Sequence, residues 1–270
     1  EIPLRLVGSE MCIRDRQYHV LNKTIESYGG LSCYWINKWE CKAYLNADVN
    51  LFLTQYDMDI LAQNYGDSIG KCFLTGCFET IDKPLINKCD NIDGKTLVIS
   101  GALNFPQTEK AVMQFLQNYF NLLELNKYNL LITGRNPSDK LVRMVYKKGA
   151  QIVASPDDID GVISSASIYL CPITDGGGFK LRMMDGLRLG MPVITHANSV
   201  RGYEVLMGKP YFVTYDSTYS FVECLQKIED GLKQKRINSD EIQKDYIAHF
   251  SLNAGIRKLY SICNELLLNR

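Results

Sequence analysis

Short apolar runs alternate with amphipathic stretches along most of this chain. The runs at 96–100, 129–133, 151–154 and 168–171 are typical of buried parallel strands. Between them, apolar residues recur at helical spacing. A regular β-α alternation of this kind predicts an α/β fold built on a doubly wound parallel sheet.

The helices expected between these strands carry start and stop signals. The stretch 109–123 is predicted as one helix with a single buried face. The members of that face are Ala111, Val112, Phe115, Leu116, Tyr119 and Leu123. A second helix is expected to begin at Ser138 and to end at Gly149. Residues 155–158 (Ser-Pro-Asp-Asp) are expected to open a third as a near capping box, with Pro156 at its first position. Its inner face would hold Ile159, Val162, Ile163 and Ala166.

Upstream of residue 79 the pattern predicts a smaller set of elements. Residues 17–45 contain two helical patterns separated by Gly29-Gly30. They are followed by a strand at 49–54, a helix at 56–65 and a strand at 71–75. The polar segment 79–92 is predicted to be a linker between domains. At the other end of the chain, the pattern predicts a strand at 211–213 and helices at 217–235, 239–250 and 253–268.

Residues 1–16 (EIPLRLVGSEMCIRDR) fit none of these elements and do not begin with methionine. We interpret them as a non-native leader, for example translated adapter sequence, and leave them out of the fold prediction. An independent read of the gene end would test this hypothesis.

Composition places the chain among globular proteins. Of its 270 residues, 46% are apolar and 22% charged, and the net charge is zero, which argues against disorder and against binding nucleic acid over the whole surface. The nine cysteines are odd in number and lack paired spacing, which predicts free thiols and a cytoplasmic location. No apolar run reaches the ~18 residues of a membrane span. The basic run 233–236 is expected to be a solvated face, with peripheral membrane contact as the alternative.

The stretch 172–193, PITDGGGFKLRMMDGLRLGMPV, combines a strand end, three glycines and a helix start. Such a corner is a natural anion cradle, because glycines let backbone N–H groups approach a ligand and the first helical turn carries partial positive charge. Lys180 adds a full positive charge there. The expected helix places Leu181, Met184 and Leu187 on one face, and Gly190 and Pro192 end it.

The run GGGFKLRMMDGLRLGMPVI resembles the donor-site motif of the GT-B glycosyltransferases of family 4, the group 1 type. That motif reads Gly-x-Gly-x-Lys, four residues, a carboxylate, a small residue and then Gly-x-Pro-Val. The resemblance covers about residues 31–268. It implies a retaining transferase that takes a hexose from a nucleotide-sugar donor.

The resemblance also implies a domain organisation. Residues 17–92 would be part of the N-terminal, acceptor-side domain with its linker, a remnant of a second Rossmann-like domain. Residues 93–250 would be the C-terminal domain that binds the nucleotide sugar, and 251–270 a helix crossing back. The first strands of the N-terminal domain are missing from this pattern, so the chain is interpreted as N-terminally truncated.

Several residues receive roles from the resemblance. Arg135, just past the strand at 129–133, and Lys180 would grip the diphosphate together. The glycines Gly176, Gly177 and Gly178, together with Phe179, would offer backbone contacts. Asp185 stands where the family has a glutamate that binds the ribose hydroxyls, and it is one methylene shorter.

Other positions near the motif are weaker candidates. Asp175, Thr174 and the loop from His196 to Ser199 sit at strand ends and could touch the sugar. As a single loop histidine, His196 is expected to be a polar contact or a bystander. Gly186 replaces the family's usual alanine, which suggests close packing at that position.

Two Asp-x-Asp sequences, at 57–59 and 158–160, invite a metal-binding interpretation. Both fall at helix starts, where aspartate ordinarily caps the helix or favours its dipole. We therefore expect a metal-independent reaction, with the nucleotide sugar as substrate and no cofactor. The acceptor, whether glycan, lipid-linked or small molecule, is not revealed.

Two alternatives stay open at this stage. One is a sugar-nucleotide epimerase of similar build, which would turn over without an acceptor. The other is a non-catalytic domain that binds nucleotide sugars. A dehydrogenase is disfavoured because the glycine run follows a late strand and lacks Gly-x-Gly-x-x-Gly spacing.

Overall fold

The computed structural model describes residues 42–66, 70–86, 95–175 and 178–268. The chain divides into two compact units. One contains Glu1–Asp82, Gly176–Lys180 and Phe250–Arg270, and the other contains Lys83–Asp175 and Leu181–His249. Among the helices in the described ranges, none is long and apolar enough to cross a membrane.

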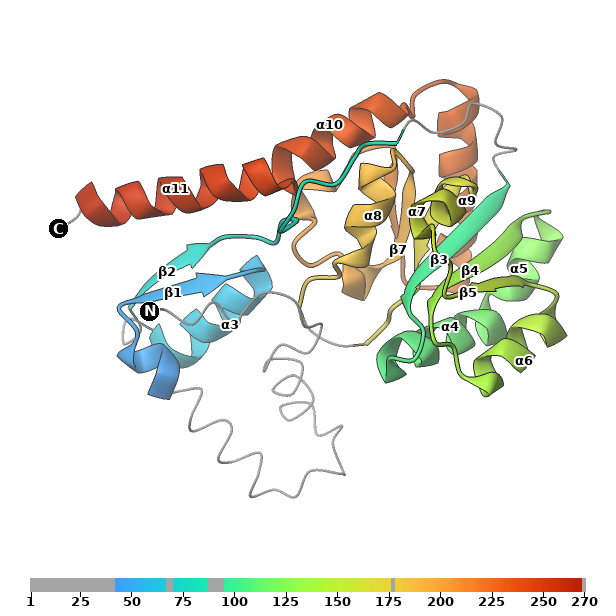
Figure 1. The fold of residues 1–270 in the computed structure, drawn as a ribbon, viewed down its shortest axis with the longest axis horizontal. Helices are drawn as coiled ribbons and strands as arrows, with labels where there is room; N and C mark the ends of the chain where they lie inside the picture. Colours follow the sequence, from blue (N-terminus) through green and yellow to red (C-terminus); the bar gives the residue numbers. More distant parts are fainter. Residues whose placement is uncertain (1–41, 67–69, 87–94, 176–177, 269–270) are drawn as a thin grey trace, which may run out of the picture. The chain divides into compact units, whose positions relative to one another are not determined.

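The second unit is built on a six-stranded parallel sheet with the strand order β5-β4-β3-β6-β7-β8 (Figure 1). Its strands are β3 (Thr96–Ala102), β4 (Asn129–Arg135), β5 (Gln151–Ala154), β6 (Ile168–Cys171), β7 (Val193–His196) and β8 (Phe212–Tyr215). All four residues of β6 are buried, as expected for a central parallel strand covered on both faces. The predicted doubly wound α/β fold is confirmed.

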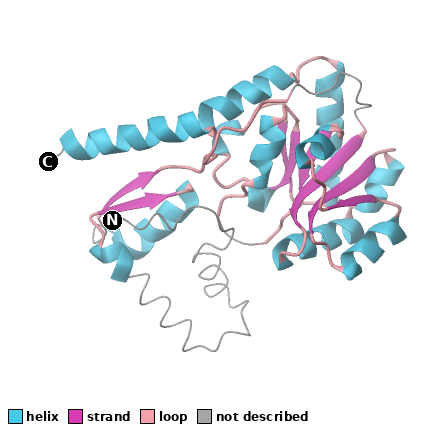
Figure 2. Ribbon diagram, viewed as in Figure 1, coloured by secondary structure: helices cyan, strands magenta, loops and turns pink. Residues whose placement is uncertain are grey.

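Helices cover both faces of this sheet (Figure 2). They are α4 (Pro106–Asn118), α5 (Phe120–Leu125), α6 (Asp139–Lys148), α7 (Ile159–Ser164), α8 (Arg182–Arg188), α9 (Thr218–Lys233) and α10 (Ser239–His249). α4 and α9 pack through an edge-to-face contact of Phe115 with Phe221, whose ring centroids are 5.4 Å apart. α7, α8 and α10 are joined by polar contacts of Arg188.

The single helix expected over 109–123 was wrong, because the chain breaks at Tyr119 into α4 and α5. Tyr119 has φ −121° and ψ −20°, outside the α-helical region. Its half-buried ring stacks on Phe115 at 5.4 Å and meets Tyr215 and Phe221 edge-on, each at 5.3 Å. This aromatic cluster surrounds the break between α4 and α5. The helical spacing of apolar residues continues from α4 into α5, so the sequence pattern gives no sign of the break.

The expected start of α7 was also wrong. Asp158 is the residue that caps the helix, and its Oδ1 accepts the N–H of Gly161 at 2.8 Å. Ser155 instead has φ 48°, a left-handed conformation unlike the extended one of a capping residue. Pro156 therefore precedes the helix, and Ile159, expected to face inward, is 37% exposed.

The boundaries of α6 agree with their sequence signals. The side chain of Ser138 accepts the N–H of Leu141 at 3.1 Å, and Gly149 ends the helix with φ 78°. These two predictions are confirmed, since the local chemistry of a cap and a left-handed glycine decides both ends.

The first unit contains a parallel β-α-β element. β1 (Val49–Phe52) pairs with β2 (Lys71–Leu74), and α3 (Gln55–Tyr65) connects them. Thr54 caps α3 by accepting the N–H of Asp57 at 3.2 Å. The strand–helix–strand order expected from the sequence between residues 49 and 75 is confirmed. The predicted leader 1–16 and the helical patterns up to residue 41 lie outside the described residues.

The same unit holds the last helix, α11 (Leu252–Leu268). A Cβ at Gly255 would lie 2.2 Å from the ring of Phe78, so the glycine lets that ring pack on the helix. The N–H of Glu79 donates to the carbonyl of Phe250 at 2.8 Å. The segment after β2 is thereby fixed to the chain that leads into α11.

Candidate functional site

The strand order creates a switch point between β3 and β6. From β3 the chain proceeds to β4 and β5 on one side, and from β6 to β7 and β8 on the other. In open α/β sheets, ligands bind beyond the carboxyl ends of the strands at such a point. The candidate site therefore lies at the carboxyl ends of β3, β4 and β6, which form the ligand-binding edge of this sheet.

Two glycines shape this edge. Gly101 and Gly134 are in register on β3 and β4, and their φ values are 149° and 150°. A Cβ at Gly134 would lie 1.7 Å from the carbonyl oxygen of Gly101. Beyond them, the N–H of Leu103 donates to the carbonyl of Arg135 at 3.0 Å. Glycine at these positions lets the two strand ends come close and turn together.

Arg135 is the last residue of β4, at the edge where sequence reasoning expected it. Its side chain is exposed. Within the described part of the chain, its guanidinium takes part in no hydrogen bond or ion pair. An exposed cation without an internal partner at a switch-point edge is suited to an anionic ligand.

Sequence reasoning missed a second arginine at this edge. Arg182 is only 7% exposed, and its Nη1 donates to the carbonyl of Ser100 at 3.3 Å. A Cβ at Gly101 would lie 2.3 Å from the same Nη1, so glycine there makes room for the guanidinium. The alternating basic residues in Lys180-Leu181-Arg182 were the available signal.

Asp175, expected to contact the donor, lies in the loop after β6 and is tied to α4. Lys110 forms an ion pair with its carboxylate, and Gln107 donates to its carbonyl. Nearby, Asn198 donates to the carbonyl of Thr174 at 2.8 Å. Since both lysine and aspartate are substantially exposed, this pair leaves the carboxylate accessible to water.

Of the glycine loop, Gly176 and Gly177 lie outside the described residues. Gly178 has φ 75°, and Phe179 places its ring 6.1 Å from that of Phe250. Lys180 is buried, with 8% exposure. Lys180 and Arg135 belong to different compact units, so their joint grip on a diphosphate stays a prediction.

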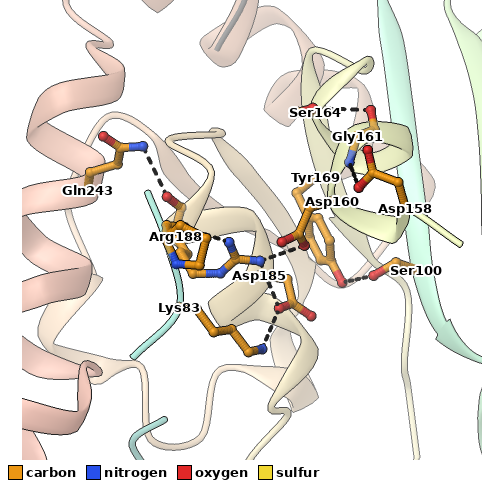
Figure 3. Close-up of polar contacts among 11 residues, drawn as sticks. Lys83, Ser100, Asp158, Asp160, Gly161, Ser164, Tyr169, Asp185, Arg188 and Gln243 are labelled. Atoms are coloured by element: carbon orange, nitrogen blue, oxygen red, sulfur yellow. Dashed lines mark hydrogen bonds and ion pairs between the residues drawn. The ribbon is translucent and has the colours of Figure 1, made fainter. Parts of the chain in front are cut away.

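Asp185 lies on α8 within a cluster of charges (Figure 3). Its Oδ1 is 3.2 Å from Nζ of Lys83 and 3.6 Å from Nη2 of Arg188. The side chain is 29% exposed. The carboxylate expected to bind ribose is thus held in place by two cations and still reaches solvent.

Arg188 is the buried centre of this cluster. Its Nη2 donates to Asp160 at 2.6 Å and its Nη1 to the carbonyl of Pro84 at 2.9 Å. Burial is the largest single influence on the pKa of Arg188 and lowers it, but the hydrogen bond to Asp160 and the charges of Asp160 and Asp185 together raise this pKa above its usual value. Asp160 therefore pairs with an arginine, and Asp158 caps α7 (Figure 3).

The glycine at 186 is explained by the ring of Tyr169. A Cβ at Gly186 would lie 2.6 Å from Cγ of Tyr169, whose hydroxyl is 2.8 Å from that of Ser100. Burial raises the pKa of Tyr169, so the hydroxyl stays protonated. The large side chain on β6 thus occupies the space that an alanine on α8 would need, and the close packing expected from the sequence is confirmed.

Replacing Gly186 by alanine is expected to destabilise the second unit by about 1–3 kcal/mol, even though alanine favours a helix by about 1 kcal/mol. Gly231→Ala in α9 is the matched control. There the added Cβ would meet Cδ1 and Cγ1 of Ile237, at 2.6 and 2.8 Å, which form the outer part of a flexible side chain. Amide hydrogen exchange in β6 would measure the loss, and equal effects of the two substitutions would contradict the packing argument.

His196 ends β7 and is half-buried. Its Nδ1 accepts the N–H of Asn198 at 3.2 Å, so the proton of the neutral ring sits on Nε2. Burial lowers the pKa of His196 despite the charges of Asp216 and Asp175, which act in the opposite direction. His196 is therefore a neutral hydrogen-bond donor at pH 7.

Leu181 was expected to lie on one face of α8 together with Met184 and Leu187. The latter two are fully buried, but Leu181 is 36% exposed. It stands at the N-cap of α8, immediately before the first helical residue, Arg182. Leu181 therefore does not share the burial of Met184 and Leu187.

Solved structures of the same fold are similar to this chain at low sequence identity. A sucrose-phosphate synthase from Thermosynechococcus elongatus has a TM-score of 0.66 at 15% identity, over 94% of this chain and 67% of its own. A glycosyltransferase from Rickettsia africae has 0.62 at 14%, over 97% and 84%. The pneumococcal O-GlcNAc transferase GtfA, solved with UDP and GlcNAc, has 0.54 at 16%, over 82% and 46%.

At these identities the likeness concerns the fold, and the chain spans less than half the length of the GtfA structures, 45% and 46%. A comparison with curated proteins finds no relative of this chain. Residues 94–229, half of the chain, match the family described as glycosyl transferases group 1. The chain therefore belongs to the group 1 glycosyltransferases, family 4, and its six-stranded parallel sheet corresponds to the C-terminal domain of their GT-B fold.

Proposed function

We propose that this chain binds a nucleotide-sugar donor and transfers its hexose to an acceptor with retention of configuration and without a metal ion. Family membership supports a nucleotide-sugar donor. The single observation that carries the proposal is the buried guanidinium of Arg182 at the carboxyl end of β3, one strand away from exposed Arg135.

The chemistry requires positive charge where the leaving diphosphate accumulates negative charge. Arg135 and Lys180 would contact the diphosphate, and Gly178 and Phe179 would offer backbone N–H groups. The guanidinium of Arg182, at the carboxyl end of β3, would add positive charge near the diphosphate. The carboxylate of Asp185 would accept a hydrogen bond from a ribose hydroxyl.

Three aspartates near the carboxyl ends of these strands have partners within the protein, which supports a reaction without metal. Asp158 caps α7, Asp160 pairs with Arg188, and Asp175 pairs with Lys110. The acceptor is left open, since none of the described contacts distinguishes a glycan from a lipid-linked or small-molecule acceptor.

Titration of UDP, GDP, ADP and their hexose derivatives by calorimetry tests the proposal. We expect Arg135→Ala and Lys180→Ala to weaken binding of the preferred nucleotide by about tenfold to a hundredfold, because each removes a charge-assisted hydrogen bond. Arg135 is exposed, so its loss should leave the fold intact. Lys209→Ala is the matched control, because it removes a lysine outside the candidate site. Lys209 pairs with Asp245 at 3.0 Å and precedes the amino end of β8.

Unchanged affinity in both site variants would contradict the proposal, as would the absence of any nucleotide binding in the wild type. Product analysis without an acceptor separates the enzyme classes. An epimerase would convert the sugar nucleotide under those conditions, whereas a transferase would leave it intact or only hydrolyse it slowly.

A further inference from the structure

The carboxylate of Asp185 is held by one of its two oxygens. Both cations lie beside Oδ1: Nζ of Lys83 is 3.2 Å away and Nη2 of Arg188 is 3.6 Å away. Oδ2 has no hydrogen bond or ion pair with the residues that the structure describes. Because the side chain is 29% exposed, this second oxygen can serve an external donor.

Lys83, and not Arg188, is the main partner of this oxygen. Arg188 is 1% exposed at its side chain and lies closer to Asp160, at 2.6 Å, than to Asp185. It also donates to the carbonyl of Pro84. Asp160 and the carbonyl of Pro84 therefore determine the position of the Arg188 guanidinium. The ammonium of Lys83 is the cation nearer to Asp185.

Lys83 supplies the second positive charge beside these two carboxylates. Asp160 and Asp185 supply two negative charges, and Arg188 and Lys83 two positive ones (Figure 3). Without Lys83 a single guanidinium would serve two carboxylates. Asp185 would then be free to rotate, since its remaining contact is the longer one, at 3.6 Å.

Hydrogen bonds fix the backbone that follows Lys83, so this lysine has a defined position. Arg188 donates to the carbonyl of Pro84 at 2.9 Å, and Gln243 of α10 donates to that of Ile86 at 3.1 Å. Gln243 also donates to the carbonyl of Arg188 at 3.0 Å. Segment 83–86 is thereby attached to α8 and α10, next to Asp185.

We propose that Lys83 is a positioning residue for the nucleotide: it holds Oδ1 of Asp185 so that Oδ2 accepts a hydrogen bond from a ribose hydroxyl. The inference rests on the proposed function, since it requires that a nucleotide binds at this edge. Lys83 itself does not touch the ligand. Its effect is specific to the ribose and leaves recognition of the diphosphate unchanged.

The experiment compares nucleotides that differ only at the ribose. The best-binding of UDP, GDP and ADP is titrated beside its 2′-deoxy and 3′-deoxy forms into wild type, Lys83→Met, Lys83→Arg, Asp185→Asn and Lys209→Met. In the wild type, one of the deoxy forms should bind about tenfold or more weakly, the effect of a hydrogen bond to a charged acceptor. In Lys83→Met and Asp185→Asn this discrimination should fall to within about threefold.

Lys83→Arg should keep the discrimination, because a cation remains beside Oδ1. Lys209→Met should also keep it, because it removes a lysine–aspartate pair of similar length elsewhere in the same unit. A Lys83→Met protein that discriminates as the wild type does would overturn the inference, and so would a wild type that binds all three nucleotides equally. In both of those results nucleotide binding persists and the proposed function stands. Absence of binding by every nucleotide would overturn the function as well.

Discussion

Substituting Arg188 by methionine is expected to lower the free energy of unfolding of the second unit by about 3 kcal/mol. Removing one member of a buried ion pair leaves the other charge uncompensated, which typically costs 3–5 kcal/mol. We expect the low end because the side chain of Asp160 is 26% exposed and can gain some hydration. The carbonyl of Pro84 would lose its donor at the same time.

The measurement should isolate the second unit, because the chain divides into two compact units that need not unfold together. Amide hydrogen exchange in β3 and β6 reports on that unit alone. The double substitution Arg188→Met with Asp160→Leu should recover at least half of the loss, since it removes both charges. Lys209→Met, which breaks a pair whose lysine is 37% exposed, should cost less. A loss below about 1 kcal/mol for Arg188→Met, or a double variant as unstable as the single one, would contradict the expectation.

The parts of the fold that local chemistry decides could be predicted from sequence. Fully buried strands such as Ile168–Cys171 appear as apolar runs, and capped helix ends such as those of α6 carry their own signals. The break at Tyr119 could not be predicted, because helical spacing records which face is buried and not whether the backbone continues. At α7, Ser155 and Asp158 were equally acceptable caps, and the left-handed conformation of Ser155 excluded the first.

The candidate site divides in the same way. Arg135 and Asp185 could be proposed from the sequence, because each belongs to a sequence motif or follows a recognisable strand. Lys83 carries no such signal: its contact with Asp185 spans 102 residues of chain and depends on how segment 83–86 is attached to α8. Arg182 was visible as a basic residue, but only the space left by Gly101 reveals why its guanidinium can lie at the strand end.

Gly134→Ala is expected to lower the free energy of unfolding of the second unit by roughly 3 kcal/mol or more. Two costs combine: a φ of 150° is a region that other residues avoid, at roughly 1–3 kcal/mol, and the added Cβ would meet a backbone oxygen, that of Gly101, at 1.7 Å. That oxygen belongs to the neighbouring strand and cannot move without opening the β3–β4 ladder. Amide exchange in β3 and β4 would measure the loss.

Gly149→Ala separates the two costs. Gly149 also has positive φ, 78°, but a Cβ there would meet nothing within 4 Å, so only a conformational cost of about 1 kcal/mol is expected. Because Gly134 precedes Arg135, a strand end that shifts to relieve the clash would displace this arginine, and Gly134→Ala should weaken nucleotide binding in any folded fraction, whereas Gly149→Ala should not. Equal destabilisation by the two substitutions would mean that the close approach of β3 and β4 does not build this edge of the sheet.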